Sequence, residues 1–280
     1  MTNYTYTLIT GASEGLGKSF ALTCAGLKHN LILVALPGPE LDHLALFIEQ
    51  NFSVKVIAIH QDLSEESGPL NVFQKVDEMN LKVNVLINNA GIGNTRLFED
   101  EQISFYDKQI RINVLATTAL THLFIPMLKS NGPSHILNVS SLACFFAIPR
   151  KQVYGGTKSF IYFFSRSLRA ELKDYNVNVS VLCPGGINTN ARQTMLNKSG
   201  SWISLQSLMN PEDVAPVALA AMYRGKEVII PGRLNRFIVA IDPLVPQIVK
   251  KRIIRKQIGK LRVYSSAAPI YQHGTARLAG

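Results

Sequence analysis

Tyr154 and Lys158 are four residues apart in the stretch VYGGTKSF, so in a helix their side chains project from one face. A free tyrosine keeps its proton up to about pH 10, which is too high for acid–base catalysis at neutral pH. A lysine ammonium beside the phenol favours the ionised form, so we expect Lys158 to lower the pKa of Tyr154. Tyr154 would then exchange a proton with a carbonyl or an alcohol oxygen.

The elements that must position this pair are visible as seven short, apolar, β-branched runs separated by helix-length segments. The runs are YTLIT ending at Thr10, LILVA from Leu31, VKVIAI from Val54, VNVLIN from Val83, HILNVS from His135, VNVSVL from Val177 and EVII from Glu227. Such runs are typical of strands buried on both faces, and strand–helix alternation indicates a parallel sheet. We predict an α/β fold with a Rossmann-like, doubly wound, seven-stranded parallel sheet. It forms a single domain over residues 1–235, followed by a C-terminal helical extension over residues 236–280. Within the domain, NPEDVAPVALAAMY predicts a late helix capped by Asn210.

A glycine-rich turn, TGASEGLG from Thr10 to Gly17, follows the first run. Gly11, Gly15 and Gly17 stand at a strand-to-helix junction, where glycines let a pyrophosphate approach the backbone at the helix N-terminus. A flexible turn without a ligand explains the same glycines.

Six motifs in this order resemble the short-chain dehydrogenase/reductase family of the classical type. They are the glycine turn; QDLS after the third run, with Asp62 and Leu63; NNAG from Asn88 to Gly91; IRINVLA with Asn113; NVSSLACFFAIPRKQVYGGTK with Ser141, Tyr154 and Lys158; and CPGGINT from Cys183 to Thr189. The match covers residues 5–190 and continues loosely to residue 235. The basic C-terminal segment is similar to that of the bacterial 3-oxoacyl and ketone reductase-like branch.

The resemblance implies an NAD(P)-dependent oxidoreductase that interconverts a carbonyl and a secondary alcohol by hydride transfer. It makes Tyr154 the acid or base, with Ser141 on the substrate oxygen. Lys158 would also hold the nicotinamide ribose, and Asn113 would fix a water that relays protons; the neighbouring Ser140 is expected to be structural. The cofactor-binding set that it implies is Gly11, Ser13, Gly15, Leu16, Gly17, Asp62, Leu63, Asn89, Ala90, Gly91, Tyr154, Lys158, Pro184, Gly185, Ile187 and Thr189.

Each catalytic candidate also has a purely structural explanation. Tyr154 would suit an aromatic cluster with Phe160, Lys158 a solvated helix face, and Asn113 a hydrogen bond inside a helix. The alternative function is therefore a catalytically silent regulatory or scaffold protein that binds a dinucleotide on the same fold. The intact set of serine, tyrosine and lysine favours the enzyme.

The residues after the second run do not select a cofactor by charge. An acid there binds the ribose hydroxyls of NAD, and an arginine accepts the extra phosphate of NADP. The chain has Leu36 and Pro37 at these positions, and Glu14 in the glycine turn. Backbone amides near Gly38 offer a small phosphate site. Because no ribose-binding acid is present, we expect NADP(H) in preference to NAD(H).

Two segments outside the motifs concern substrate and partners. Residues 190–209 are polar at first and then apolar, with Trp202 and Ile203, which suits either a lid over a lipophilic or 3-oxoacyl substrate or a surface helix packed on the core. Residues 224–262 hold eleven Lys/Arg and two acids, so nearly all of the net charge of +10 lies there. The basic, apolar pattern of residues 244–262 fits a helix docked on the domain, a cover for a subunit or substrate groove, or peripheral contact with an anionic membrane; nucleic acid is not expected.

The remaining composition limits the class of protein. The N-terminus has no signal-peptide pattern, and no uninterrupted apolar run approaches the roughly 20 residues of a membrane span. The three cysteines, Cys24, Cys144 and Cys183, are widely spaced in apolar surroundings, which indicates reduced core residues and neither disulfides nor a metal site. We expect a cytoplasmic protein, with peripheral membrane contact as an option, that forms a homodimer or homotetramer and acts on a small carbonyl or alcohol substrate.

Overall fold

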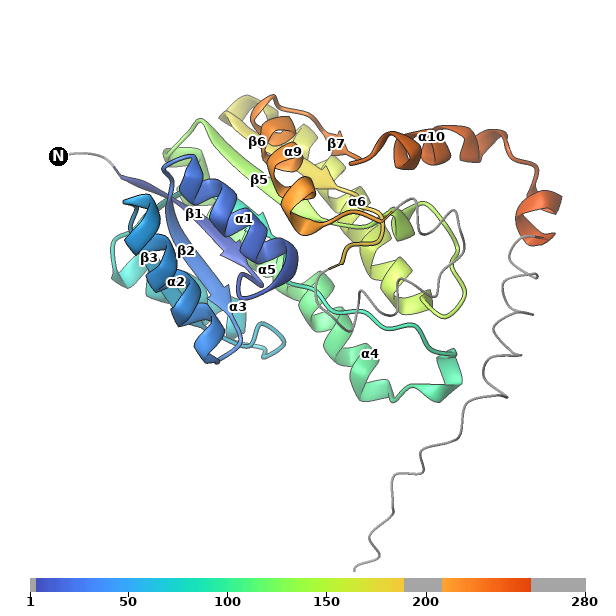
Figure 1. Cartoon of the computed structure of the whole chain (residues 1–280), viewed down its shortest axis with the longest axis horizontal. Helices are drawn as coiled ribbons and strands as arrows, with labels where there is room; N and C mark the ends of the chain where they lie inside the picture. The colour runs from blue at the N-terminus through green and yellow to red at the C-terminus, as the bar shows by residue number, and fades with distance from the viewer. Residues whose placement is uncertain (1–3, 189–207, 253–280) are drawn as a thin grey trace, which may run out of the picture. The chain divides into compact units, whose positions relative to one another are not determined.

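The computed structural model describes residues 4–188 and 208–252 (Figure 1). The chain divides into two compact units, Met1–Ala240 and Ile241–Gly280. The boundary that the sequence predicted, after residue 235, falls inside helix α10 (Arg233–Ile241).

The first unit is built on a seven-stranded sheet whose strands all run parallel, as predicted. Its strands are β1 (Thr5–Thr10), β2 (Asn30–Ala35), β3 (Val56–His60), β4 (Lys82–Asn88), β5 (Ser134–Val139), β6 (Val177–Leu182) and β7 (Val228–Ile229). Their spatial order is β3-β2-β1-β4-β5-β6-β7. The register pairs Ile9 of β1 with Leu33 of β2 on one side and with Ile87 of β4 on the other. The order of the strands reverses between β1 and β4, and ligands of such sheets bind at the carboxyl ends of the strands beside this reversal.

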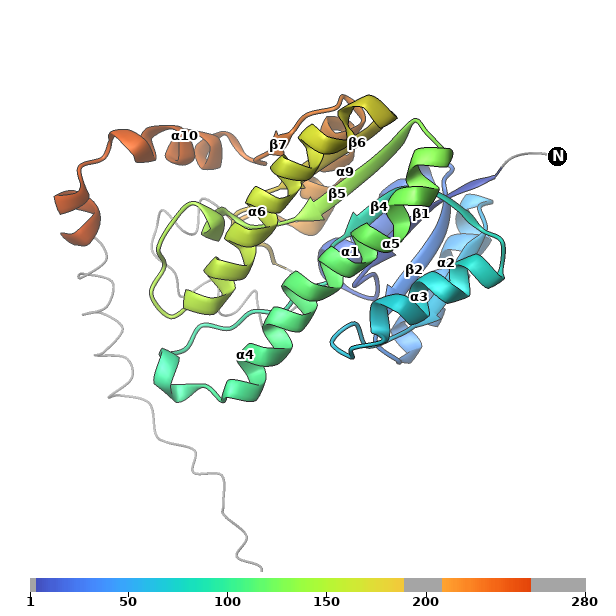
Figure 2. The ribbon, with the colours of Figure 1, turned by 180° about the vertical axis from the view of Figure 1, so that it is seen from behind.

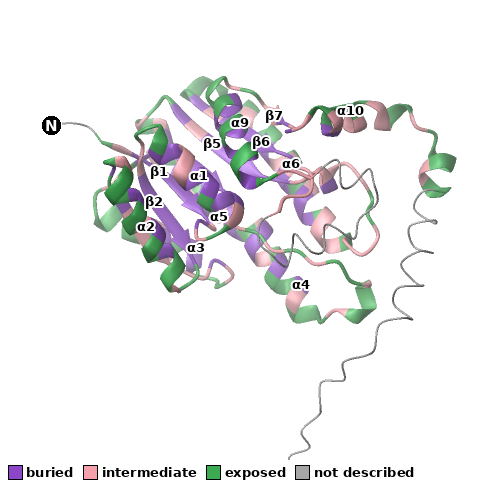
Figure 3. Cartoon of the chain, in the orientation of Figure 1, coloured by how far each residue is buried: buried purple, intermediate pink, exposed green. Residues whose placement is uncertain are grey.

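Helices cover both faces of the sheet. One face carries α1 (Gly15–Gly26), α2 (Pro39–Phe52) and α9 (Pro211–Tyr223), seen in front in Figure 1, and it buries side chains such as Phe20, Ile48 and Met222. The opposite face carries α3 (Gly68–Glu78), α5 (Thr117–Ser130) and α6 (Gln152–Leu172), seen in front in Figure 2, and it buries Val72 and Phe124 among others. Figure 3 shows the strands buried between these layers, which is why their sequences are almost uninterruptedly apolar.

Helix α9 begins where the sequence predicted it, with Pro211 in its first turn and Asn210 at the N-cap position. The Asn210 side chain does not cap the helix. Its Oδ1 instead accepts a hydrogen bond of 3.2 Å from Nδ2 of Asn188, so it ties the chain after β6 to the start of α9.

The segment Ile103–Ser130 is continuously helical and consists of α4 (Ile103–Ile110), the π-helical turn η2 (Arg111–Ala116) and α5. In length and composition it is the one helix of the described residues that could cross a membrane. Core helices of globular proteins meet the same criteria, and Leu120, Phe124 and Leu128 of α5 pack into the second core. Packing in the sheet layers therefore accounts for these apolar residues of α5.

The second unit begins at the end of α10 and continues with the 3-10 turn η5 (Asp242–Leu244). Residues 247–252 are helical, and Nζ of Lys250 contacts Oδ2 of Asp242 at 2.7 Å. Leu244 and Ile248 are each 81% exposed. The rest of the predicted basic segment lies outside the described residues.

Candidate active site

A clamp of two side chains joins the carboxyl ends of β1 and β4. Oγ1 of Thr10 accepts hydrogen bonds from the backbone amides of Asn89 and Ala90, both at 3.0 Å. In return, Nδ2 of Asn89 donates to the carbonyl oxygens of Thr10 at 2.9 Å and of Gly11 at 3.1 Å. Thr10 and Asn89 therefore hold the glycine turn against the NNAG segment at the point where the strand order reverses.

The glycine turn approaches this clamp so closely that side chains are excluded. Gly11 has φ of +64°, and a Cβ there would stand 2.9 Å from Cα of Ala90. A Cβ at Gly17 would collide with the carbonyl oxygen of Gly11. Gly15 has φ of +54° and begins α1, with Leu16 buried behind it and Ser13 in the same turn. This bare backbone at the N-terminus of a helix fits a dinucleotide pyrophosphate.

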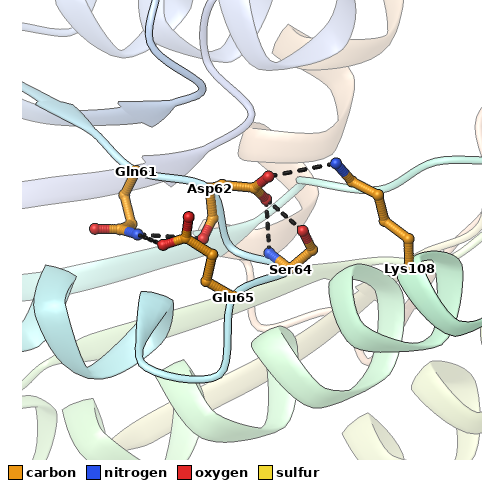
Figure 4. Close-up of polar contacts among 5 residues, drawn as sticks. All are labelled: Gln61, Asp62, Ser64, Glu65 and Lys108. Carbon is orange, nitrogen blue, oxygen red and sulfur yellow. Dashed lines mark hydrogen bonds and ion pairs between the residues drawn. The ribbon is translucent and has the colours of Figure 1, made fainter.

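Asp62, one of the expected cofactor-binding residues, is the centre of a polar network after β3 (Figure 4). Its Oδ1 accepts from the backbone amide of Ser64 at 2.8 Å and from Oγ of Ser64 at 2.6 Å, while its Oδ2 lies 3.3 Å from Nζ of Lys108 on α4. Burial opposes ionisation of Asp62, but these hydrogen bonds outweigh it and hold its pKa below the ordinary value. The neighbouring Leu63 packs into the second core.

Asn113 lies in the π-helical turn η2 and is 1% exposed. Its Oδ1 accepts from the amide of Ile92 at 2.9 Å, and its Nδ2 donates to the Ile92 carbonyl at 3.0 Å and to Oγ1 of Thr157 at 3.0 Å. Thr157 in turn donates to the carbonyl of Tyr154 at 2.8 Å. Asn113 thus links the loop after β4 to the first turns of α6, which is a positioning role that the sequence did not predict.

Lys158 belongs to α6 and is buried, with 5% of its surface exposed. Its Nζ donates to the carbonyl of Val139 at 2.9 Å, while its own carbonyl accepts from Oγ of Ser140 at 2.7 Å. Ser140 therefore has a structural contact. Burial lowers the pKa of Lys158 to about 8. A Cβ at Gly91 would stand 3.2 Å from this ammonium group, so the NNAG segment passes directly over it.

Tyr154 is half-buried, and its side chain interacts with the side chain of Ser141. Lysine ammonium groups stand near its ring, with Nζ of Lys151 5.5 Å and Nζ of Lys158 5.8 Å from the centroid. A Cβ at Gly93 would come within 2.7 Å of the ring.

The pKa of Tyr154 differs from the sequence-based expectation. Burial raises the pKa of Tyr154, and the interaction with Ser141 only partly offsets that effect. The predicted lowering of the pKa of Tyr154 is therefore wrong, because burial outweighs the other contributions. Nζ of Lys158 lies 5.8 Å from the ring centroid and donates to the Val139 carbonyl.

The loop after β6 continues past the site with Pro184 buried and Gly185 half-buried. Ile187 pairs with Met209 as an isolated parallel bridge, and the amide of Met209 donates to the carbonyl of Gly186 at 3.0 Å. Residues 186–188 therefore lie next to Met209. Thr189, and the predicted lid apart from Leu208 and Met209, lie outside the described residues.

Three features of this region were missed in the sequence. Thr10 belongs to the glycine motif, yet only the structure shows its clamp. Gly93 carries no motif. Glu40 follows the apparently uncharged turn after β2, and its Oε2 folds back to lie 2.7 Å from where a Cβ of Gly38 would be. The signal available in the sequence was a carboxylate only four residues after Leu36, the first of the two positions that normally indicate the cofactor.

Comparison with known proteins identifies the family. The family model described as short chain dehydrogenase matches residues 5–200. The NADP-dependent 3-hydroxy acid dehydrogenase of Schizosaccharomyces pombe is 31% identical over 233 residues, covering 81% of this chain and 90% of the relative. The very-long-chain 3-oxoacyl-CoA reductase-A of Danio rerio is 28% identical over 185 residues, which is 64% of this chain but only 57% of that relative.

Solved structures agree with this assignment. The bulky-bulky ketone specific alcohol dehydrogenase from Comamonas testosteroni superposes with a TM-score of 0.73 at 25% identity, covering 100% of both chains. The short-chain dehydrogenase from Sphingobium yanoikuyae, solved with NADPH, has a TM-score of 0.73 at 26% identity and covers 98% of this chain and 99% of its own. With the resemblance confirmed, the chain belongs to the short-chain dehydrogenase family.

Proposed function

We propose that this protein is an NAD(P)-dependent oxidoreductase that interconverts a carbonyl and a secondary alcohol, with Tyr154 as its acid or base. The observation that carries the proposal is that the side chains of Ser141 and Tyr154 interact close to the Lys158 ammonium and beside a bare glycine cradle. The bound nicotinamide supplies or accepts the hydride.

Ser141 and Tyr154 orient the substrate, stabilise the developing charge and transfer the proton. Ser141 orients the substrate oxygen toward Tyr154, and both hydroxyls stabilise the negative charge that develops on that oxygen. Tyr154 donates its proton to the oxygen during reduction and removes it during oxidation. Burial raises the pKa of Tyr154, which favours the protonated form that donates during reduction.

The test is turnover of NADPH and NADH with a panel of ketones and 3-oxoacyl compounds. Tyr154→Phe should reduce the rate by about 10²–10⁴-fold while dinucleotide binding persists. Tyr162→Phe is the matched control, because Tyr162 lies on the same helix but packs against Phe145 at a centroid distance of 4.9 Å. An unchanged rate in Tyr154→Phe contradicts the mechanism. Dinucleotide binding without turnover of any substrate supports the silent alternative.

For the substrate we propose a lipophilic or 3-oxoacyl compound. The names of the Danio rerio and Comamonas testosteroni relatives support long acyl chains and bulky ketones. The apolar residues at the end of the predicted lid, including Leu208 and Met209, are consistent with such a group. We expect kcat/KM to rise with acyl chain length, and a preference for short polar ketones would contradict this.

For the cofactor we propose NADP(H), as in the Schizosaccharomyces pombe relative and the Sphingobium yanoikuyae complex. Glu40 offers a specific test of this preference, because a carboxylate beside Gly38 would repel the 2′-phosphate of NADP(H) if it faced the ribose. Titration of NADPH and NADH against wild type and Glu40→Gln decides. Tighter binding of NADH that is lost in Glu40→Gln would overturn the NADP(H) assignment.

We further propose a homodimer or homotetramer that uses the aromatic face of α6. Phe160 and Phe163 on this helix are 42% and 63% exposed. Light scattering of wild type and Phe163→Asp tests the interface, and an unchanged mass for the variant contradicts it.

For location we propose a cytoplasmic protein with peripheral membrane contact through residues 244–262. The exposed Leu244 and Ile248 beside the basic residues Lys251 and Arg252 support it. Flotation with anionic vesicles should recover the full chain but not a chain shortened after residue 243. Equal recovery of both would remove the membrane contact.

A further inference from the structure

Two cysteines that are 39 residues apart in the sequence meet beside the candidate active site. Cys144 ends the 3-10 turn η3 (Leu142–Cys144), and Cys183 is the first residue after β6. Their Sγ atoms are 3.9 Å apart and share a hydrogen bond. Both are free thiols, as is Cys24 in α1.

The pair connects the two segments that form the substrate side of the site. The segment that carries Ser141 is held to the end of β6 and to the loop that follows it by two backbone hydrogen bonds. The amide of Ser140 donates to the Leu182 carbonyl at 2.7 Å, and the amide of Leu142 donates to the Pro184 carbonyl at 2.8 Å. Cys144 is three residues from Ser141, and Cys183 directly precedes the loop that begins at Pro184.

The two thiols are not equivalent. Cys144 is half-buried, and the hydrogen bond that it shares with Cys183 lowers its pKa. Cys183 is completely buried, and that hydrogen bond together with burial raises its pKa. A thiolate, not a thiol, attacks an oxidant, so Cys144 is the first to react and Cys183 is placed to respond. Cys24 has neither advantage, because it is buried alone and burial raises its pKa to about 12.

We propose that Cys144 and Cys183 form an oxidative modification site, in which a hydroperoxide converts them to a reversible disulfide. The Cys144 thiolate attacks hydrogen peroxide, taking one oxygen to become a sulfenic acid and releasing hydroxide. The Cys183 sulfur then attacks that sulfur and forms the sulfur–sulfur bond, while its proton passes to the departing hydroxyl, which leaves as water. The two thiols lose two electrons in all, and the peroxide is reduced by the same two electrons.

The disulfide changes the geometry beside the catalytic serine. The two sulfurs must approach from 3.9 Å to the bonding distance of about 2.0 Å, a closure of nearly 2 Å. The backbone hydrogen bonds of Ser140 and Leu142 restrain both segments, so the end of η3, where Cys144 is half-buried, takes up much of the movement. A shift of about 1 Å at a reacting group costs up to about 10²-fold in rate. This loss of activity rests on the proposed function, whereas formation of the bond does not.

The experiment treats the full-length reduced protein with hydrogen peroxide and follows mass first and activity second. We expect a mass lower by two hydrogen atoms, loss of two of the three thiols, and a tryptic crosslink between residues 130–150 and 174–192. Reductase activity should fall at least tenfold, as the displacement requires, and dithiothreitol should restore both. Unchanged mass and three remaining thiols under these conditions overturn the proposal, whatever the activity shows.

Variants test the role of each cysteine, and they distinguish disulfide formation from the loss of activity. Cys183→Ala should stop at a sulfenic acid on Cys144 that dimedone traps, and Cys144→Ser should form no disulfide. Cys24→Ala is the matched control and should oxidise like wild type. A crosslink that contains Cys24, or dimedone capture on Cys144 in wild type without any disulfide, refutes the pairing. A disulfide that forms in a protein without reductase activity overturns only the proposed function.

Discussion

Replacing Lys158 by methionine should change how the stability of the protein depends on pH, because Lys158 is a cation held in the interior. Its side chain is 5% exposed, and its contact with the Val139 carbonyl does not compensate for the loss of hydration. Burial therefore lowers its pKa from 10.5 to about 8. Methionine keeps a similar length and removes the charge.

The sign and size of this pH dependence follow from the proton that Lys158 takes up when the protein unfolds. Between about pH 8 and pH 10.5 the unfolded chain holds a proton on Lys158 that the folded chain has released, so stability rises with pH. The full difference between the two pKa values corresponds to about 3.4 kcal/mol, and the part between pH 7 and pH 9.5 is about 2 kcal/mol. This contribution is complete above pH 10.5 and is lost as the pH falls toward 8.

The assay is urea unfolding of wild type and Lys158→Met at about pH 7 and pH 9.5. The free energy of unfolding of wild type, minus that of the variant, should increase by about 2 kcal/mol at the higher pH. Taking the difference between wild type and variant cancels the contributions of the other titrating groups. Lys75→Met, which removes an exposed lysine from α3, controls for the loss of a positive charge. A difference that is the same at both pH values would refute the argument that Lys158 is a desolvated cation.

Three further predictions concern groups around the site and the sheet. Gly93→Ala should lower kcat about tenfold or more without lowering the melting temperature, because the added Cβ would stand 2.7 Å from the Tyr154 ring; kinetics and a thermal melt check it. Asn113→Ala should lower the free energy of unfolding by about 2–4 kcal/mol, since its buried hydrogen-bond partners are left unsatisfied, as urea unfolding would measure. Burial lowers the pKa of His29 and His135, so unfolding takes up protons and stability should fall as the pH drops below about 6.5; thermal melts of wild type and His135→Phe should show a smaller loss in the variant.

Each of these has a result that contradicts it. A normal kcat in Gly93→Ala would mean that the tyrosine ring does not need its observed position. Wild-type stability in Asn113→Ala would mean that water replaces the amide without cost. Identical acid sensitivity of wild type and His135→Phe would place the titrating groups elsewhere in the chain.

The fold was predictable because a strand that is buried on both faces of a sheet must be composed almost entirely of apolar residues. Each of the seven apolar runs is a strand, and the parallel order follows from the helices that separate them. The glycine turn was predictable for a related reason, since Gly11 and Gly17 occupy positions where any Cβ would meet backbone. In both cases a local steric or solvation requirement dictates the residue type.

The electrostatics of the site were less predictable because pKa values depend on burial and on which atom a flexible side chain reaches. The spacing of Tyr154 and Lys158 placed them on one helix face, but the direction of the tyrosine pKa shift was predicted wrongly. Glu40 was missed for the same reason, since only its folded conformation brings the carboxylate to Gly38.

The sequence by itself therefore determined the sheet, the family and the identity of the candidate catalytic side chains, because these depend on residue type and order along the chain. The tertiary structure decided what those side chains touch. It joined Thr10 to Asn89, directed Lys158 to the Val139 carbonyl and brought Cys144 to within 3.9 Å of Cys183. Such contacts join residues from different strands and helices, and their distances arise only when the layers pack.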